Sequence, residues 1–196
     1  MGKDLASSFR PAILMTVLFA LLLGIAYPLV LTGVGQIFFP HQANGSLILN
    51  RGRVVGSELL AQGFAADKYF HPRPSAAGKG YDPLASAGSN LGPASQALHD
   101  RMARDIKMLQ ASAPAASVPL DLVTASASGL DPDITPEAAL YQVPRVAKAR
   151  GMDEAQLRAM VAESTRHPLL GLIGEDRVNV LLLNRQLDAT GAKQGR

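Results

Sequence analysis

A long apolar run near the start of the chain dominates its hydrophobic pattern. No Asp, Glu, Lys or Arg occurs from residue 11 to residue 50, and 21 of the 28 residues from Ala12 to Phe39 are hydrophobic. An α-helix rises about 1.5 Å per residue, so about 20 apolar residues cross the hydrocarbon core of a bilayer. The pattern predicts a transmembrane anchor helix and its exit over residues 11–39, after a short N-terminal tail over residues 1–10.

Two other structures also give long apolar runs. A buried core helix is rarely apolar on every side over this length. The apolar region of a cleaved signal peptide is usually about 7–15 residues long and ends at a small-x-small cleavage site. Here the run is longer and no clean Ala-x-Ala site follows it, which favours a retained single-span anchor. Pro28 removes one helix hydrogen bond and is expected to kink or end the helix.

Basic residues near the apolar run bear on its orientation. Lys3 and Arg10 precede it closely, whereas Arg51 and Arg53 follow at a greater distance. Cytoplasmic flanks of membrane spans carry an excess of Lys and Arg. Proximity therefore favours a cytoplasmic N-terminus and an extracytoplasmic soluble domain.

The remainder of the chain, residues 40–196, is predicted to form one soluble domain. Helical periodicity mixed with short strand signals predicts an α+β fold that is mostly helical with a small sheet. The first expected elements are a hairpin of strands 46–49 and 53–56, a helix over 94–110 with Pro93 at its start, and a strand over 119–124. Two helices are expected next, one over 135–150 that is capped by Thr135 and kinked or split at Pro144, and one over 153–165 that is opened by Asp153. The segment over 178–187 is either a strand with a turn or, as its spacing favours, a final helix.

Composition narrows the possible chemistry. The chain has no Cys, which excludes disulfides, Cys-ligated zinc, iron–sulfur clusters and thiol catalysis. Its 19 basic and 16 acidic residues give a formal net charge of only +3, without the basic cluster typical of nucleic-acid-binding proteins. The four His residues are scattered without metal-ligand spacing, so no metal site is expected. Neither a P-loop nor a Rossmann glycine motif occurs, so we do not expect this chain to hydrolyse nucleotide alone.

Three polar clusters stand out in the soluble part, at residues 69–75, 89–93 and 124–132. On ordered loops such residues can form a recognition surface. The simpler interpretation is that Ser, Asn and Asp cap helices while Pro and Gly build turns. The candidate partner contacts within the clusters are Tyr69, Phe70, Arg73, Ser75, Ser89, Asn90, Ser126 and Ser128.

A membrane-anchored Ser/Lys hydrolase is a further alternative. Ser75 would be the nucleophile, with Lys79 or Lys148 as the base. The sequence around Ser75 lacks both the G-x-S-x-G and the S-x-x-K spacing, and a serine beside a proline more often serves a turn.

The polar clusters belong to a longer series of motifs. In chain order these are the N-terminal span, GSELL from Gly56, YFHPRPSA from Tyr69, SNLGP from Ser89, VPLDLVT from Val118, SASGLDP from Ser126, QVPRVA from Gln142 and RVNV from Arg177. Together they resemble the KdpC family, the C subunit of the bacterial Kdp potassium-transporting P-type ATPase. The resemblance covers nearly the whole chain.

This resemblance implies a non-catalytic accessory subunit of an ATP-driven, high-affinity potassium uptake complex in the bacterial cytoplasmic (inner) membrane. Its partners would be a channel-like, potassium-binding A subunit, a P-type ATPase B subunit that performs catalysis, and a small F subunit, with membrane lipid around the span. The subunit would stabilise the complex and act as a catalytic chaperone that raises the ATP affinity of the B subunit. The family's proposed nucleotide contact is the Gln of QVPRVA, which is Gln142 here.

These implications conflict, because a domain outside the membrane cannot touch cytoplasmic ATP. The sequence also offers no phosphate-cradling loop. We therefore expect no cofactor bound to the chain alone and an effect on ATP exerted through the ATPase subunit, with direct ATP binding at Gln142 as the alternative. Asp131, Asp133 and Glu137 form a local acidic group that could concentrate potassium near an entrance, or could simply serve a turn and a helix N-terminus.

Overall fold

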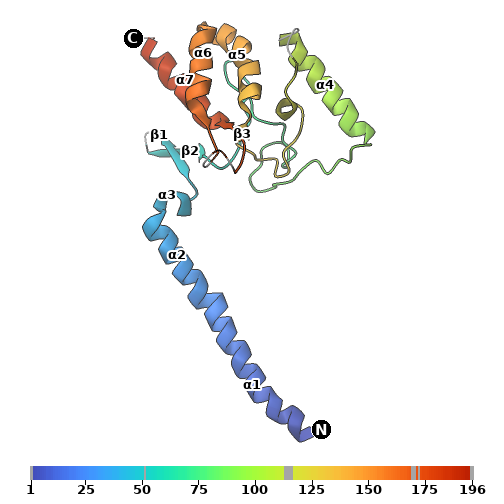
Figure 1. Cartoon of the computed structure of the whole chain (residues 1–196), viewed down its shortest axis with the longest axis vertical. Coiled ribbons are helices and arrows are strands. Elements are labelled where there is room, and N and C mark those ends of the chain that lie inside the picture. Colours follow the sequence, from blue (N-terminus) through green and yellow to red (C-terminus); the bar gives the residue numbers. More distant parts are fainter. Residues whose placement is uncertain (1, 51, 113–116, 169–170, 172, 195–196) are drawn as a thin grey trace. The chain divides into compact units, whose positions relative to one another are not determined.

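The computed structural model describes residues 2–50, 52–112, 117–168, 171 and 173–194. The chain divides into two compact units, residues 1–55 and residues 56–196. Each unit is described by itself below (Figure 1).

The first unit is dominated by one long apolar helix. It consists of α1 (Gly2–Leu21), a π-helical turn η1 (Leu22–Ala26) and α2 (Tyr27–Phe38). The stretch Ser7–Phe38 is long and apolar enough to cross a membrane, and none of its most apolar window is buried in the chain. This confirms the predicted single apolar helix near the N-terminus, and the exposure of its side chains contradicts a buried core helix. Residues 2–10, expected as a tail, are already helical.

Pro28 does not end this helix, contrary to one of the two outcomes expected for it. The pyrrolidine ring of a helical proline clashes with the carbonyl four residues earlier, which here belongs to Gly24. Gly24 lies within the π-helical turn that immediately precedes α2. The wider π-turn accommodates the proline, and the helix continues to Phe38.

A short helix and a hairpin follow the span. The helix is α3 (Pro40–Ala43), and the predicted hairpin is confirmed as β1 (Leu47–Asn50) and β2 (Arg53–Ser57), which pair with each other. Gly52 has φ +79°, a left-handed value that glycine adopts at little cost in a tight turn. Arg51, one of the basic residues weighed above for orientation, lies outside the described residues.

The second unit is a helical domain around a small sheet, which confirms the α+β fold. Strand β5 (Arg177–Asn179) lies between β3 (Asp133–Ile134) and β4 (Thr165–Arg166) in an antiparallel sheet, with Val178 opposite Ile134 on one side and Thr165 on the other. The helices are α4 (Gln96–Ser112), α5 (Pro136–Arg150), α6 (Glu154–Ser164) and α7 (Val180–Gln194), with a 3₁₀ turn η2 (Leu120–Leu122).

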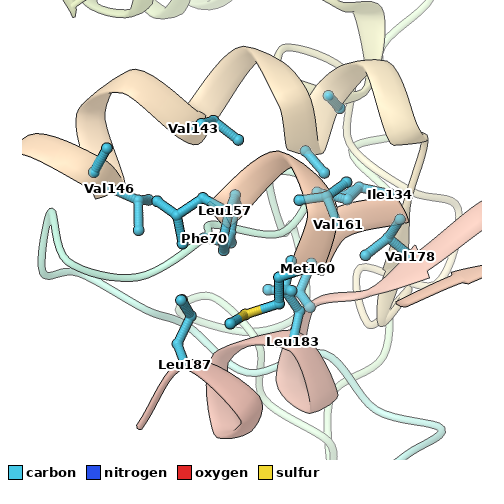
Figure 2. Close-up of a cluster of buried hydrophobic side chains, with 14 of the residues drawn as sticks. Phe70, Ile134, Val143, Val146, Leu157, Met160, Val161, Val178, Leu183 and Leu187 are labelled. Atoms are coloured by element: carbon cyan, nitrogen blue, oxygen red, sulfur yellow. The ribbon is translucent and has the colours of Figure 1, made fainter. Parts of the chain in front are cut away.

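The core lies between the sheet and helices α5, α6 and α7. Figure 2 shows Val143 and Val146 from α5, Leu157 and Val161 from α6, and Leu183 and Leu187 from α7 converging there with Phe70. Phe70, Leu157 and Leu183 have no exposed surface. Burying a side chain of this size contributes about 1.5–3 kcal/mol, so these contacts hold the three helices together.

Local capping signals predict the central helices well. The Thr135 hydroxyl accepts a hydrogen bond from the Ala138 amide at the start of α5, and Gly151 ends the helix in the left-handed conformation at φ +63°. The Asp153 carboxylate accepts from the Ala155 amide at the start of α6. Pro144 does not split α5, which runs unbroken from Pro136 to Arg150.

Three segments differ from the prediction. Residues 119–124 are not a strand, because amide hydrogen bonds from Leu122 to Pro119 and from Val123 to Leu120 wind them into η2. Helix α4, which was expected to start at Pro93, starts at Gln96, three residues later. The segment over 178–187 combines the two expected elements, because β5 ends at Asn179 and α7 follows from Val180. The Asn179 side chain caps α7 by accepting from the Leu182 amide at 3.1 Å.

Candidate functional site

One extended segment of the soluble unit, residues 67–75, carries the largest of the polar clusters. It has no regular secondary structure over most of its length, so its backbone cannot satisfy its own hydrogen bonds. Side chains from α5 and α7 do so instead, and we call this stretch the docked segment.

Two side-chain amides pair with consecutive residues of the docked segment. Asn184 on α7 accepts from the Phe70 amide at 2.8 Å and donates to the Phe70 carbonyl at 2.9 Å. Gln142 on α5 accepts from the His71 amide at 2.8 Å and donates to the His71 carbonyl at 3.1 Å. Each amide thus supplies one donor and one acceptor, as a neighbouring strand would.

Gln142 uses its whole hydrogen-bonding capacity inside the domain. Besides His71, its Oε1 accepts from Nη2 of Arg145 at 2.7 Å and its Nε2 donates to the Ala138 carbonyl at 3.2 Å. A carboxamide has two donor hydrogens and two acceptor lone pairs, so the four bonds leave none over. The side chain is only 3% exposed.

Arginines fix the start of the docked segment. Arg145 donates to the Asp67 carbonyl and Arg150 to the Lys68 carbonyl, each at 2.6 Å. Arg150 also lies over the Tyr69 ring, 5.0 Å from its centroid, and pairs with Asp188 at 2.7 Å. The Tyr69 hydroxyl donates to the same Asp188 carboxylate at 3.1 Å. Tyr69 is therefore held from both its ring face and its hydroxyl.

The end of the docked segment joins the cluster at residues 124–132. Arg73 donates to Asp131 at 3.2 Å and to the Thr124 hydroxyl at 3.3 Å. The Ser75 hydroxyl donates to the Gly129 carbonyl at 2.6 Å and accepts from the Tyr81 amide at 2.8 Å. Two of the three polar clusters, at residues 69–75 and 124–132, are thus packed against each other.

Burial separates the predicted partner contacts into two sets. The Phe70 side chain is fully buried in the core and Ser126 is only 6% exposed, so neither belongs to the surface of the described unit. Asn90 is exposed in the left-handed conformation at φ +51°. The remaining members that are partly or largely exposed are Tyr69, Arg73, Ser75, Ser89 and Ser128.

The acidic group is partly neutralised by arginine. Asp131 pairs with Arg73, and Asp133 pairs with Arg177 at 3.2 Å. These four residues line one open cavity of about 450 Å³, whereas Glu137 lies exposed in the first turn of α5. Burial raises the pKa of Asp133, against the opposing effects of a hydrogen bond with Asn179 and the charge of Arg177. Potassium focusing by this group stays a prediction.

His71 is the histidine most affected by its surroundings. Burial lowers its pKa, and the positive charge of Arg145 lowers it further. The neutral imidazole is thus favoured, with Nε2 3.3 Å from the Ala66 carbonyl. Among the residues the structure describes, no group of three or more His, Asp or Glu side chains is arranged to hold a metal ion.

The Ser75 hydroxyl does not lie in a hydrolase-like arrangement. Its hydrogen bonds all go to backbone groups, namely Gly129, Ala77 and Tyr81. Lys148 lines a cavity together with Arg145, and Ser75 is not among the residues that line this cavity. The geometry gives Ser75 the turn role that a serine beside a proline commonly has.

The sequence interpretation missed the residues that do most of the docking, Asn184, Arg145 and Arg150. Asn184 left a signal, because it is a polar residue on the apolar face that Val180, Leu183 and Leu187 give to α7. A polar side chain on a buried stripe must find hydrogen-bond partners, although the sequence alone does not name them.

Comparisons with known proteins match almost the whole chain. Residues 9–189 match the family model described as "KdpC: K+-transporting ATPase, c chain". The potassium-transporting ATPase KdpC subunit of Rhodopseudomonas palustris (strain BisB18) is 54% identical over 192 residues, which cover 92% of this chain and 96% of that protein. The KdpC subunit of Caulobacter sp. (strain K31) is 55% identical over 184 residues, with 93% and 94% covered, and that of Bradyrhizobium diazoefficiens is 52% identical over 196 residues, with 94% and 98% covered. The family match spans the apolar helix, the docked segment and both amides that hold it, so the chain belongs to the KdpC family, as a subunit of a potassium-transporting ATPase.

Proposed function

We propose that this chain is a non-catalytic accessory subunit, which stabilises the potassium uptake complex and assists ATP use by another subunit. Its partners are a channel-like A subunit, a P-type ATPase B subunit and a small F subunit. Its helix spans the inner membrane with a cytoplasmic N-terminus, and its soluble unit is extracytoplasmic. The position of Lys3 and Arg10 just before the apolar run supports this orientation.

The hydrogen bonds of Gln142 support the proposal that this subunit affects ATP binding only indirectly. A direct nucleotide contact would need a free donor or acceptor on this side chain. All four of its hydrogen-bonding positions are instead used by His71, Arg145 and Ala138. Withdrawing the amide would leave the partly buried amide and carbonyl of His71 unpaired, at up to about 1–3 kcal/mol each. Gln142 therefore acts on the complex by holding the docked segment in shape.

Asn184 provides a matched control for this proposal, because it makes the same pair of bonds to Phe70 from outside the QVPRVA motif. In the reconstituted complex, Gln142→Ala and Asn184→Ala should raise the KM for ATP to a similar extent. Both should also lower the melting temperature of the subunit. The measurements are steady-state ATPase kinetics at saturating potassium and thermal unfolding of each variant chain.

A selective effect would contradict the indirect role. If Gln142→Ala raised the KM for ATP while Asn184→Ala left it unchanged at equal loss of stability, the amide of Gln142 would have to touch the nucleotide. Saturable binding of ATP to the full chain alone, abolished by Gln142→Ala, would lead to the same conclusion.

A further inference from the structure

The hairpin β1–β2 exposes an apolar surface immediately after the membrane span. Leu47 is 45% exposed and Val54 57% exposed, and Leu49 and Val55 are exposed as well. Leu47 and Leu49 share one face of β1, because alternate residues of a strand do. A two-stranded hairpin of this length is only marginally stable in water by itself, so a surface that covers its apolar side chains would stabilise it.

The chain folds back before the hairpin begins. Asn44 donates to Gln36 at 3.2 Å, and Gln36 donates to Asn44 at 3.4 Å. An ideal Cβ placed on Gly35 would lie 3.8 Å from that of Ala43. Residues 43 and 44 are therefore level with residues 35 and 36 of the span, and α3 does not carry the hairpin farther out.

The length of the helix places Gln36 and Asn44 at the membrane surface. Arg10 and Gln36 are the polar residues at the two ends of the apolar run, and the helix between them rises about 40 Å at 1.5 Å per residue. A bilayer with its headgroup layers is about 40–45 Å thick. When Arg10 lies among the headgroups of one leaflet, Gln36 and Asn44 lie among those of the other. Leu47 then begins β1 three residues from the headgroup layer.

The charge near the hairpin fits an anionic surface. No Asp or Glu occurs between Asp4 and Glu58, whereas two basic residues, Arg51 and Arg53, occur in the sequence of the hairpin. Lys and Arg next to a membrane span are attracted to anionic lipid by about 1 kcal/mol each. Apolar side chains beside basic ones are the combination that binds in the plane of a bilayer interface.

We propose that the β1–β2 hairpin lies on the bilayer, with the face of β1 that carries Leu47 and Leu49 among the headgroups of anionic phospholipids. The hairpin would thereby fix the height and the direction in which the chain leaves the membrane. This surface is separate from the docked segment and its two amides, and it is independent of the role assigned to Gln142.

The chain contains no Trp, so one substitution gives a single reporter. The full chain carrying Leu47→Trp is reconstituted into vesicles of phosphatidylcholine and phosphatidylglycerol, part of which is brominated on the acyl chains close to the headgroup. Leu23→Trp, in the span, gives the value for full lipid contact. Leu84→Trp, at a position 96% exposed in the second unit, is measured in detergent to give the value for full access to aqueous iodide.

The expected result is blue-shifted emission from L47W, quenching by lipid brominated near the headgroup, and protection from iodide. Arg53→Gln in the L47W background should weaken the quenching, by about fivefold in the association equilibrium at low salt. Emission as accessible to iodide as that of L84W would overturn the proposal. Blue-shifted emission without quenching by brominated lipid would overturn it too, because the hairpin would then be covered by protein.

Discussion

Asn184→Ala is expected to destabilise the soluble unit by about 2–4 kcal/mol, because it leaves the amide and the carbonyl of Phe70 unpaired. Both residues are almost completely buried, with Asn184 1% and Phe70 0% exposed. Water therefore cannot replace the lost partners without opening the core. Asn184→Asp should also destabilise the unit, since a carboxylate keeps the acceptor for Phe70 but places an oxygen against its carbonyl.

Chemical denaturation of the full chain in detergent, followed by circular dichroism, measures this effect. Gln186→Ala is the matched control, because Gln186 is exposed on the same helix and its Oε1 accepts from the hydroxyl of the partly exposed Ser164. This change should stay within about 0.5 kcal/mol of the parent. An Asn184→Ala variant as stable as Gln186→Ala would show that the amide does not hold the docked segment.

Gly129→Ala is expected to cost about 4 kcal/mol or more, which is exceptional for a single methyl group. Gly129 has φ +67°, and a Cβ there would lie 2.6 Å from the Ala87 carbonyl oxygen and 2.7 Å from the Ala77 amide nitrogen. Both obstacles are backbone atoms, so no side chain can move aside. Gly129 also accepts from Ser75, which makes it one of the points at which the docked segment meets the 124–132 cluster.

Gly151 separates packing from backbone strain in this test. Its φ of +63° is almost the same, but nothing lies within 4 Å of an added Cβ. Gly151→Ala should therefore cost only the left-handed conformation, about 1–2 kcal/mol. The same denaturation measurement on both variants gives the difference, and equal losses would contradict the close backbone approach at Gly129.

How far the sequence predicts this molecule depends on the range of each interaction. The apolar helix, the Thr135 and Asp153 caps and the Gly151 helix end are set by residues within a few positions, and the sequence predicts them. The bond from Gln142 to His71 joins residues 71 positions apart, and that from Asn184 to Phe70 joins residues 114 apart. No local pattern encodes such a pairing.

The wrong prediction of a strand over 119–124 has a different cause. Its short apolar stretch fits a strand as well as a turn, but Leu122 and Val123 are both buried, which a regular strand with one solvent face does not allow. The Thr124 hydroxyl donates to the Leu120 carbonyl at 2.8 Å and closes the turn. Tertiary burial on both sides therefore decided between two conformations that the local sequence left nearly equal.

The side of the membrane on which the soluble unit lies tests the proposed function most directly. The chain has no Cys, so Leu84→Cys and Ser8→Cys each give a single thiol, in the soluble unit and just before the charge-free apolar run that starts after Arg10, respectively. Spheroplasts expressing either variant with its partner subunits are treated with a membrane-impermeant maleimide, and inverted vesicles are treated in the same way. The account predicts that L84C is labelled in spheroplasts and S8C only in inverted vesicles. Labelling of S8C in spheroplasts, with L84C protected until the vesicles are inverted, would place the soluble unit beside cytoplasmic ATP and contradict the indirect role proposed for it.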